Sequence, residues 1–215
     1  MRTRMLLTFV GAAALALSTV FVGSASAATP GAQATVVAQQ SGSATRYVLS
    51  EQGSAVTPGA IPPGSEVFQL RNGADQNLCL DAKTQDGGVN GNTVQLFTCL
   101  GTSQPNQFWW PRTTTHGFTE LVNVAYQSKC LDADNAGGLT VGHKVQLWDC
   151  FNDSLSHANQ WWDFGPGDGV TYTALPNLAN SASFVLDAAT QTIGNGGKVQ
   201  IWTFSAGASN QLWRQ

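Results

Sequence analysis

The feature that most constrains this chain is a set of motifs that occurs three times between residue 66 and the C-terminus. The first copy contains Cys79-Leu80-Asp81-Ala82, Val94-Gln95-Leu96-Phe97 and Asn106-Gln107-Phe108-Trp109. The second contains Cys130-Leu131-Asp132-Ala133, Val145-Gln146-Leu147-Trp148 and Asn159-Gln160-Trp161-Trp162. The third contains Val185-Leu186-Asp187-Ala188, Val199-Gln200-Ile201-Trp202 and Asn210-Gln211-Leu212-Trp213. Equivalent positions lie 51 to 55 residues apart, and the differences fall in loops, where insertions are tolerated.

The repeats predict an all-β fold. Each has short alternating runs separated by turn clusters such as Asp86-Gly87-Gly88. A β-propeller has about four or more blades, whereas this chain has three repeats. Because one repeat cannot bury its own apolar face, we expect a closed, barrel-like domain over residues 66–215 with pseudo-threefold symmetry. The repeats cover about residues 66–112, 113–166 and 167–215.

The N-terminus has the form of a secretory signal peptide. Arg2 and Arg4 precede an apolar run over residues 5–22, and small residues including Ala25 and Ala27 follow. An uncleaved membrane anchor is the alternative, but the Ala-x-Ala ending favours cleavage after Ala27. We therefore expect a signal peptide over residues 1–27 and a secreted, extracellular protein. No other stretch is long and apolar enough to span a membrane.

Residues 28–65 have the composition of a linker or a loosely attached arm. They are rich in alanine, glycine, proline and small polar residues, which favours an extended chain. The segment Arg46-Tyr47-Val48-Leu49 has the pattern of a strand. Composition does not decide whether this arm docks on the repeats.

The cysteines predict two disulfide bonds, since secretion places them in an oxidising compartment. Four cysteines allow three pairings, but Cys79 and Cys99 are 20 residues apart, and so are Cys130 and Cys150. The equal intervals favour these two local bridges over either crossed pattern. The chain has no C-x-x-C motif and its three histidines lack ligand-like spacing, so we expect no metal and no cofactor.

Low charge argues against nucleic acid as a partner. Charged residues make up 11% of the chain, compared with about 25% in an average soluble protein. The formal net charge is −3, and loss of the two leader arginines leaves −5. No basic face is available to neutralise phosphates.

Strand periodicity gathers a carboxylate, an amide and an aromatic ring on one face of each repeat. Successive side chains of a strand point to opposite faces, so Val94 and Leu96 point inward while Gln95 and Phe97 share the face of the cysteine bridge. Asp81 shares the parity of Cys79 and lies on that outward face. The equivalent sets are Asp132, Gln146 and Trp148 in the second repeat, and Asp187, Gln200 and Trp202 in the third. Val185 and Phe204 replace the cysteines of the third repeat, and we expect an apolar contact there.

Those three groups suit a sugar. The apolar C–H face of a pyranose lies flat on an aromatic ring, and its vicinal hydroxyls donate to a carboxylate. An aspartate can also serve as a turn residue, but its recurrence beside an outward aromatic residue favours sugar binding.

The recurring C-L-D, V-Q-L-W and N-Q-x-W motifs resemble the ricin B-chain-type (R-type) lectin family, or family 13 carbohydrate-binding modules, over about 150 of the 215 residues. The resemblance implies a β-trefoil fold. It also implies that each aspartate accepts from two sugar hydroxyls, that the aromatic residue stacks, and that the asparagine of the N-Q pair binds a hydroxyl. The implied carbohydrate-binding residues are Asp81, Gln95, Phe97, Asn106 and Gln107; Asp132, Gln146, Trp148, Asn159 and Gln160; and Asp187, Gln200, Trp202, Asn210 and Gln211. Phe97 replaces the family's usual tryptophan or tyrosine.

Several repeated residues have structural interpretations. Trp109, Trp162 and Trp213 are expected to be core residues because of their symmetric placement. For the glutamines of the N-Q pairs, sugar contact and hydrogen bonding to the backbone are equally open. Trp110 and Trp161 break the threefold pattern and are either exposed platforms or packing residues.

Three function classes follow. We expect a non-enzymatic lectin with up to three sites for galactose-type sugars or a xylan-like plant or microbial polysaccharide. The alternative is a protein-binding trefoil, an inhibitor or adhesin, in which the sugar pockets are vestigial. A small glycoside hydrolase is less favoured, because it needs two carboxylates about 5 to 9.5 Å apart and each pocket has one. Asp149 and Asp163 form the only candidate acidic pair beside a pocket. The sequence leaves the oligomeric state open.

Overall fold

The computed structural model describes residues 34–41, 44–50, 60–151, 155–165, 171–180 and 183–215. The signal peptide predicted for residues 1–27 lies outside these ranges, as do residues 28–33 and 51–59 of the arm. The strands are β1 (Val36–Ser41), β2 (Ala44–Leu49), β3 (Phe68–Gln69), β4 (Arg71–Asn72), β5 (Leu78–Ala82), β6 (Asn92–Thr98), β7 (Phe108–Thr113), β8 (Thr119–Asn123), β9 (Lys129–Ala133), β10 (Val145–Asp149), β11 (Thr173–Ala174), β12 (Pro176–Asn177), β13 (Phe184–Ala188), β14 (Gly197–Thr203) and β15 (Leu212–Arg214). The 3-10 helices are η1 (Thr84–Asp86), η2 (Gly101–Ser103), η3 (Pro105–Gln107), η4 (Leu155–Gln160), η5 (Leu178–Asn180), η6 (Thr190–Thr192) and η7 (Ser209–Gln211).

The first and last strands of the repeats form a closed ring. Strand β7 pairs with β3 of its own repeat and with β8 of the next one. Trp162 bridges Thr119 of β8 to Asn177 of β12. Strand β15 pairs with β11 and returns to β4, which closes the ring. This closure is the barrel that the three repeats predict.

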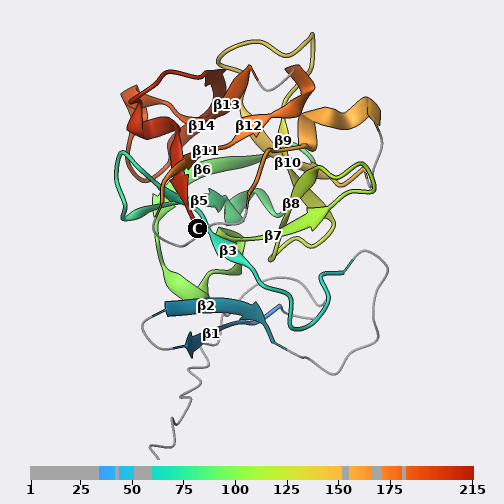
Figure 1. Cartoon of the computed structure of the whole chain (residues 1–215), viewed down its shortest axis with the longest axis vertical. Coiled ribbons are helices and arrows are strands. Elements are labelled where there is room, and N and C mark those ends of the chain that lie inside the picture. The colour runs from blue at the N-terminus through green and yellow to red at the C-terminus, as the bar shows by residue number, and fades with distance from the viewer. Residues whose placement is uncertain (1–33, 42–43, 51–59, 152–154, 166–170, 181–182) are drawn as a thin grey trace, which may run out of the picture.

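Three hairpins cover one end of that ring (Figure 1). They are β5–β6, β9–β10 and β13–β14, one from each repeat. Strand β6 pairs with both β10 and β14, and a bridge between Lys144 and Gln200 joins the remaining two hairpins. A barrel capped by a triplet of hairpins is the β-trefoil architecture, so the expected fold class is confirmed.

The core repeats with the same symmetry. Leu80, Leu131 and Leu186, from the first strand of each hairpin, have no exposed surface. The repeated tryptophans lie beside them and donate their indole N–H to the carbonyl oxygens of these leucines. The prediction that Trp109, Trp162 and Trp213 are core residues is therefore confirmed.

Both expected disulfides are present, Cys79–Cys99 and Cys130–Cys150. In the third repeat the expected apolar replacement is only half buried. Val185 lies in the core at 1% exposure, but 51% of Phe204 remains exposed. All three positions directly follow a strand, but disulfides hold Cys99 and Cys150, whereas no covalent bond holds Phe204 against Val185.

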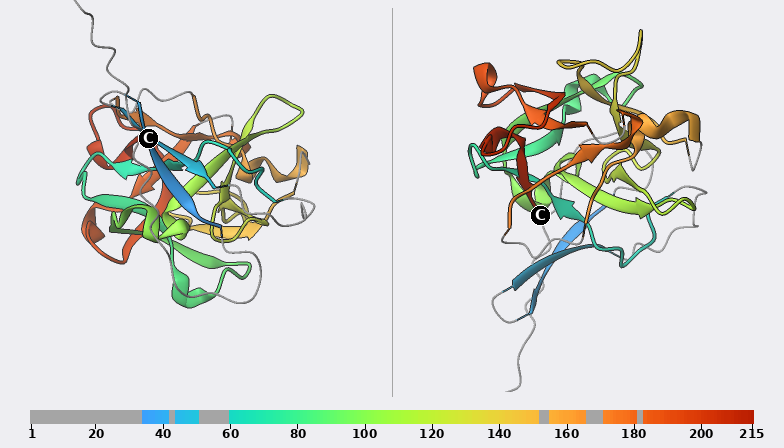
Figure 2. Two further views of the ribbon diagram at one scale, coloured as in Figure 1. Left: turned by 90° about the horizontal axis from the view of Figure 1, so that it is seen from below. Right: turned by 45° about the horizontal axis from the view of Figure 1, so that its top comes forward.

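The arm docks through a hairpin. Strands β1 and β2 pair along their whole length, so the strand predicted around Tyr47 is present and has a partner that composition did not indicate. Val36 and Leu49 are buried in one apolar cluster with Phe108 and Val122 of β8. The Tyr47 ring contacts that of Phe108 edge-on. A bridge from Val48 to Glu66 ties the hairpin to the first repeat. Figure 2 shows the hairpin lying across one side of the repeats.

Candidate functional site

In each repeat, three side-chain amides hold one aspartate. In the first, Gln95 Nε2 donates to Asp81 Oδ1 at 3.0 Å, while Asn106 Nδ2 and Gln107 Nε2 donate to Oδ2 at 2.8 and 3.1 Å. The same three bonds recur around Asp132, at 3.1, 2.8 and 3.0 Å. Around Asp187 they measure 2.9, 2.8 and 3.0 Å. We call these arrangements sites 1, 2 and 3; each consists of the five residues predicted for its repeat.

Strand register and a short helix assemble each site. Asp81 on β5 lies directly opposite Gln95 on β6, so their side chains share a face as strand periodicity predicts. Helix η3 then turns the N-Q pair over this face. Asn106 Nδ2 bridges the Asp81 carboxylate and the Ala82 carbonyl oxygen, which fixes the helix relative to the hairpin.

The carboxylates are less accessible than an outward position suggests. Asp81, Asp132 and Asp187 expose 4%, 3% and 4% of their surfaces, because the amides lie over them. Burial raises the pKa of Asp81 and of Asp132 above the ordinary range, and the amide donors oppose the rise only in part. The nearby Asp134 carboxylate adds to the effect at Asp132.

The aromatic residue of each site is the more accessible part. Cys79 pairs with Phe97, Cys130 with Trp148, and Val185 with Trp202. Each ring therefore shares the face of the aspartate and lies one pleat away. Phe97 and Trp148 are partly buried, while 43% of Trp202 is exposed. Site 3 thus presents the most open ring.

The glutamines of the N-Q pairs are fully engaged with the protein. Gln107 Nε2 donates to Asp81 and to the Thr98 carbonyl oxygen, and its Oε1 accepts from Gln69 Nε2 and from the Leu100 N–H. Gln107 and Gln160 have no exposed surface, and Gln211 has 2%. Of the two interpretations left open above, the geometry favours the structural one.

Three asparagines that sequence reasoning missed support the sites. Asn123 Nδ2 donates to the carbonyl oxygen of Asn106, so the second repeat supports site 1. Asn177 does the same for Asn159 of site 2, and Asn72 for Asn210 of site 3. All three supporting side chains are fully buried. A signal was available, because each precedes its own repeat's aspartate by 9 or 10 residues.

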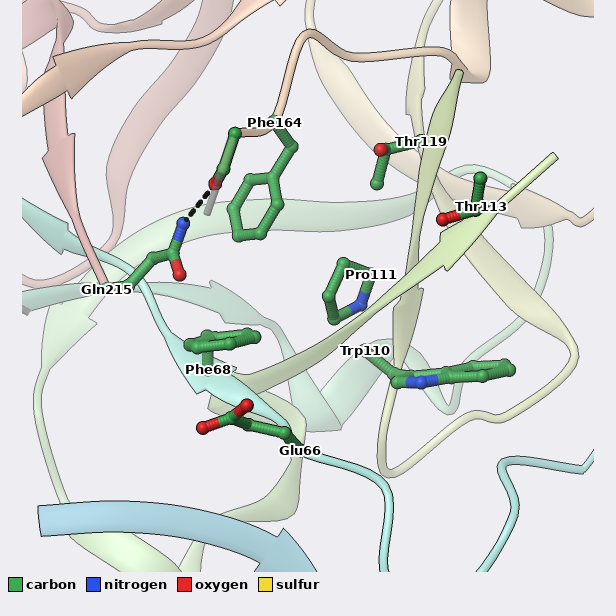
Figure 3. A pocket seen from close by; sticks show the side chains of 9 residues that line it. Glu66, Phe68, Trp110, Pro111, Thr113, Thr119, Phe164 and Gln215 are labelled. Atoms are coloured by element: carbon green, nitrogen blue, oxygen red, sulfur yellow. Dashed lines mark hydrogen bonds between the residues drawn. The ribbon is translucent and has the colours of Figure 1, made fainter. Parts of the chain in front are cut away.

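The two tryptophans outside the threefold pattern lie away from the sites. Trp161 is 3% exposed and stacks on Phe118 with ring centres 4.7 Å apart, so it is a packing residue. Trp110 is partly buried and lines a cavity of about 340 Å³ with Phe68 and Phe164 (Figure 3). That cavity contains none of the fifteen predicted site residues.

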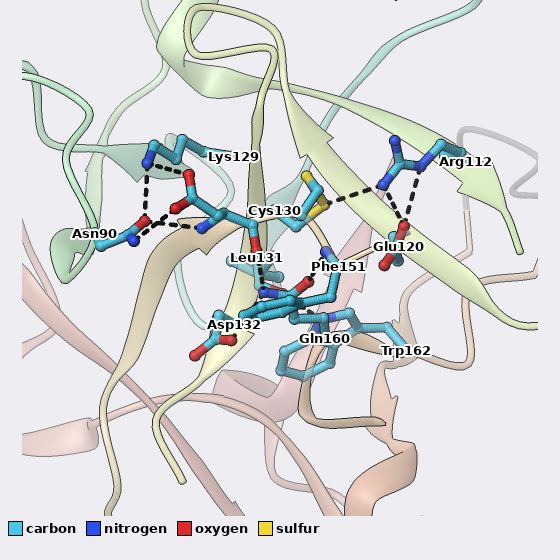
Figure 4. The surroundings of a disulfide bond; sticks show 12 residues. Asn90, Arg112, Glu120, Lys129, Cys130, Leu131, Asp132, Phe151, Gln160 and Trp162 are labelled. Carbon is cyan, nitrogen blue, oxygen red and sulfur yellow. Dashed lines mark hydrogen bonds and ion pairs between the residues drawn. A yellow bond between two sulfur atoms is a disulfide. The ribbon is translucent and has the colours of Figure 1, made fainter. Parts of the chain in front are cut away.

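Asp149, one member of the candidate acidic pair of the hydrolase alternative, is engaged by two neighbouring side chains. Asp149 forms an ion pair with Lys129 at 2.6 Å and accepts a hydrogen bond from Asn90. Figure 4 shows Lys129 and Asn90 close to each other in the surroundings of the second disulfide. The hydrogen bond from Lys129, followed by that from Asn90, lowers the pKa of Asp149. Within the described ranges, no cluster of histidine, cysteine and acidic residues is suited to a metal ion. No helix in that part of the chain is long and apolar enough to cross a membrane.

Comparisons with known proteins agree with the β-trefoil fold. The model of the ricin-type beta-trefoil lectin domain matches residues 66–213. Beta-galactoside-specific lectin 3 of Viscum album is 30% identical over 131 residues, which cover 60% of this chain but only 19% of that lectin. This chain therefore corresponds to about a fifth of that relative's length.

Solved structures show the same fold. The designed threefold-symmetric protein ThreeFoil superposes with a TM-score of 0.56 and 25% identity, covering 69% of this chain and 96% of that one. The Rhizoctonia solani agglutinin gives 0.55 with 18% identity, covering 75% and 97%. An exo-beta-1,3-galactanase from Clostridium thermocellum gives 0.52 with 17% identity, covering 91% and 44%. The last two likenesses concern the fold alone.

Proposed function

Because the chain belongs to the ricin-type β-trefoil lectin family, whose members bind carbohydrate, we propose that it is a secreted, non-enzymatic lectin with up to three sugar sites. Its ligands are galactose-type sugars or a xylan-like polysaccharide. The name of the Viscum album relative, a beta-galactoside-specific lectin, supports the first of these. The leader-like N-terminus and the two disulfides support secretion.

The observation that carries the proposal is the threefold recurrence of an amide-held carboxylate beside an aromatic ring. A carboxylate offers about four lone-pair positions, and the three amides use three of them. Capacity for a hydroxyl donor therefore remains at each aspartate. The ring one pleat away suits the apolar face of the same sugar.

Within each site we assign different roles to the five residues. Asp81, Asp132 and Asp187 accept from sugar hydroxyls, and Phe97, Trp148 and Trp202 stack on the ring. Asn106 and Asn159 have side-chain oxygens with no protein donor, so these atoms are further acceptors for a hydroxyl once the site adjusts to a sugar. The glutamines Gln95, Gln146 and Gln200, and Gln107, Gln160 and Gln211, position the carboxylates.

The test is a glycan array probed with the wild-type protein and a triple variant, Asp81→Asn, Asp132→Asn and Asp187→Asn. An amide keeps the shape of the carboxylate, and Gln95 and its equivalents can reorient to accept from it, so the fold is retained. We expect each site to lose about 2 kcal/mol or more, the value of hydrogen bonds to a charged acceptor.

The matched control is Asp163→Asn, because Asp163 is exposed and outside the three sites. It should bind like the wild type. If the wild-type protein binds galactosides or xylans and the triple variant binds them equally well, the sugar is recognised outside the three sites. If neither protein binds any glycan, the protein-binding alternative takes precedence.

A further inference from the structure

The barrel has a second end, opposite the three hairpins. Each repeat enters the barrel there with its first strand and leaves it there with its last, as β3 and β7 do in the first repeat (Figure 1). The first strands contribute one residue each, paired with the core tryptophan of the same repeat: Phe68, Thr119 and Thr173. The last strands contribute the residues two positions after those tryptophans, Pro111, Phe164 and Gln215.

Strand periodicity directs these side chains toward the barrel axis. Phe68 has the parity of Leu70, and Pro111 has the parity of Trp109, both of which lie in the core. Because the repeats place rings and short polar side chains at equivalent positions, this end is unevenly filled. The result is the cavity of about 340 Å³ whose wall includes Trp110, and pockets for small ligands start at about this volume.

Aromatic rings form the apolar part of the wall. Phe68 and Phe164 meet edge-on with ring centres 5.9 Å apart, so the first and second repeats both contribute. These two rings and that of Trp110 are only partly buried. Figure 3 shows Phe68, Phe164 and Pro111 around the hollow, with Thr119 and Gln215 on opposite sides. A ring that reaches solvent is available to the C–H face of a sugar.

Hydroxyls and a carboxylate form the polar part of the wall. Thr113 and Thr119 pair across β7 and β8, and each has a hydroxyl that can donate and accept. The Glu66 side chain is 43% exposed, and Arg46 of the arm pairs with its Oε1 at 3.0 Å. Since a carboxylate has about four lone-pair positions, Glu66 can also accept from a ligand hydroxyl.

The charge of the wall selects among ligands. Of the described residues that line the cavity, Glu66 is the only charged one, and its ion pair with Arg46 balances that charge. A charged ligand would therefore have no counter-charge here, and a purely apolar one would leave the threonine hydroxyls and the carboxylate without partners. A neutral molecule with one apolar face and several hydroxyls fits both parts of the wall. A sugar ring has this combination.

We propose that this cavity is a fourth saccharide site, in which a neutral sugar unit stacks on an aromatic ring and donates a hydroxyl to Glu66. The inference goes beyond the three sites of the proposed function and uses none of their residues. Those sites lie on the hairpins, whereas the cavity lies at the other end of the barrel. One molecule can therefore hold two polysaccharide chains at opposite ends.

The experiment uses the triple variant Asp81→Asn, Asp132→Asn, Asp187→Asn, which keeps the cavity and disables sites 1, 2 and 3. The ¹⁵N-labelled variant is titrated with galactose, linear β-galactotriose, xylose and xylotriose and followed by NMR. We expect at least one of these saccharides to shift the indole N–H of Trp110 and the backbone amides of Phe68 and Phe164. The expected Kd is about 1 to 10 mM, typical of a shallow site with few contacts.

Two substitutions in the triple variant test the two parts of the wall. Phe68→Leu keeps an apolar side chain but removes a flat ring, and should weaken binding about fivefold. Glu66→Gln keeps the shape but removes the charge, and should weaken binding about threefold. Glu66 is exposed and its surface ion pair adds little to stability, so this variant remains informative even if Phe68→Leu disturbs folding.

Matched controls change the same chemistry away from the cavity. Phe118→Leu removes a partly exposed ring that stacks on Trp161, and Asp149→Asn removes the carboxylate of the ion pair with Lys129. Neither residue lines the cavity, so both controls should bind like the triple variant. Urea unfolding of every variant shows whether a loss of binding reflects a loss of folded protein.

The outcomes separate this inference from the proposed function. If the wild-type protein binds sugar and the triple variant shows no shifts, the fourth site is wrong and the three-site lectin stands. Shifts that spare Trp110, Phe68 and Phe164, or binding that survives both cavity substitutions, would also overturn the fourth site. If the triple variant binds as tightly as wild type and the cavity substitutions weaken both proteins, the fourth site stands and the three-site proposal fails. If wild type binds no saccharide, both are wrong.

Discussion

Each site aspartate is buried beneath three side-chain amides that donate hydrogen bonds to it. These amides come from two separate sequence motifs, the V-Q pair and the N-Q pair. Strand periodicity predicted that Asp81, Gln95 and Phe97 share a face, since side chains alternate in any strand. It did not predict that Asn106 and Gln107 lie over the carboxylate. That contact joins residues 25 and 26 positions apart through a helical turn whose direction is set by packing.

At the residue scale we predict that acid weakens sugar binding before it unfolds the protein. Burial raises the pKa of Asp81 and Asp132, so these carboxylates take up a proton at a higher pH than an ordinary aspartate. The ionised form is the acceptor, and binding at sites 1 and 2 is therefore lost as the pH falls through the raised pKa. Calorimetric titration of the Asp187→Asn variant across this range measures the loss.

The same two carboxyl groups affect the free energy of unfolding in the opposite direction to sugar binding as the pH falls. Because their pKa is higher in the folded than in the unfolded chain, their contribution to stability is present at low pH and is lost as the pH rises through the folded-state pKa. Circular dichroism over the same pH range is the control. If binding declines only together with the folded signal, the prediction is wrong.

A second residue-scale prediction concerns Gln107. Its side chain has no exposed surface and bonds to Asp81, Thr98, Gln69 and Leu100, so Gln107→Ala leaves several buried groups unpaired. We expect a loss of about 3 kcal/mol in the free energy of unfolding, measured with urea. Gln85→Ala is the matched control, since Gln85 is exposed and should change stability by less than about 0.5 kcal/mol. Loss of sugar affinity with unchanged stability would instead identify Gln107 as a ligand contact.

At the scale of elements, the hairpins differ in how they are held together. The β5–β6 and β9–β10 hairpins each carry a disulfide that closes a loop across 20 residues. The β13–β14 hairpin carries Val185 and the half-exposed Phe204 at those positions. The arm is the other element-scale difference. Its composition indicated a linker, but burial of Val36 and Leu49 against the repeats overrides that tendency.

We predict that the third hairpin opens first. A disulfide across a loop of this size contributes roughly 3 kcal/mol, and the third hairpin lacks that contribution. Hydrogen exchange followed by mass spectrometry should show faster amide exchange in β13 and β14 than in β5, β6, β9 and β10. After reduction of both disulfides the difference should shrink. Slower exchange in β13–β14 under oxidising conditions would contradict the prediction.

At the scale of the whole molecule, the sites are linked in a circle. Asn123 supports site 1, Asn177 supports site 2, and Asn72 supports site 3, each from the repeat that follows around the ring. A site is therefore complete only when the barrel is closed. This arrangement explains why one repeat alone is not expected to bind sugar.

We predict that Asn123→Ala weakens site 1 although Asn123 belongs to the second repeat. In the Asp132→Asn, Asp187→Asn background, which retains site 1, the affinity for a bound sugar should fall about tenfold, because the carbonyl of Asn106 loses its donor. Calorimetry measures the change. Asn177→Ala in the same background is the matched control, as it removes an equivalent bond at site 2 and should leave site 1 within about twofold. Equal losses from both variants would indicate a general loss of stability instead.

The sequence by itself determined the repeats, the faces of the hairpin strands, the two disulfides and the core tryptophans. These features depend on local spacing, on the two-residue period of a strand and on the apolar positions that recur in every repeat. Tertiary structure alone decided which repeat supports which site, and how deeply the carboxylates and glutamines are buried. Those properties arise from contacts between repeats, and such contacts exist only after the ring has closed.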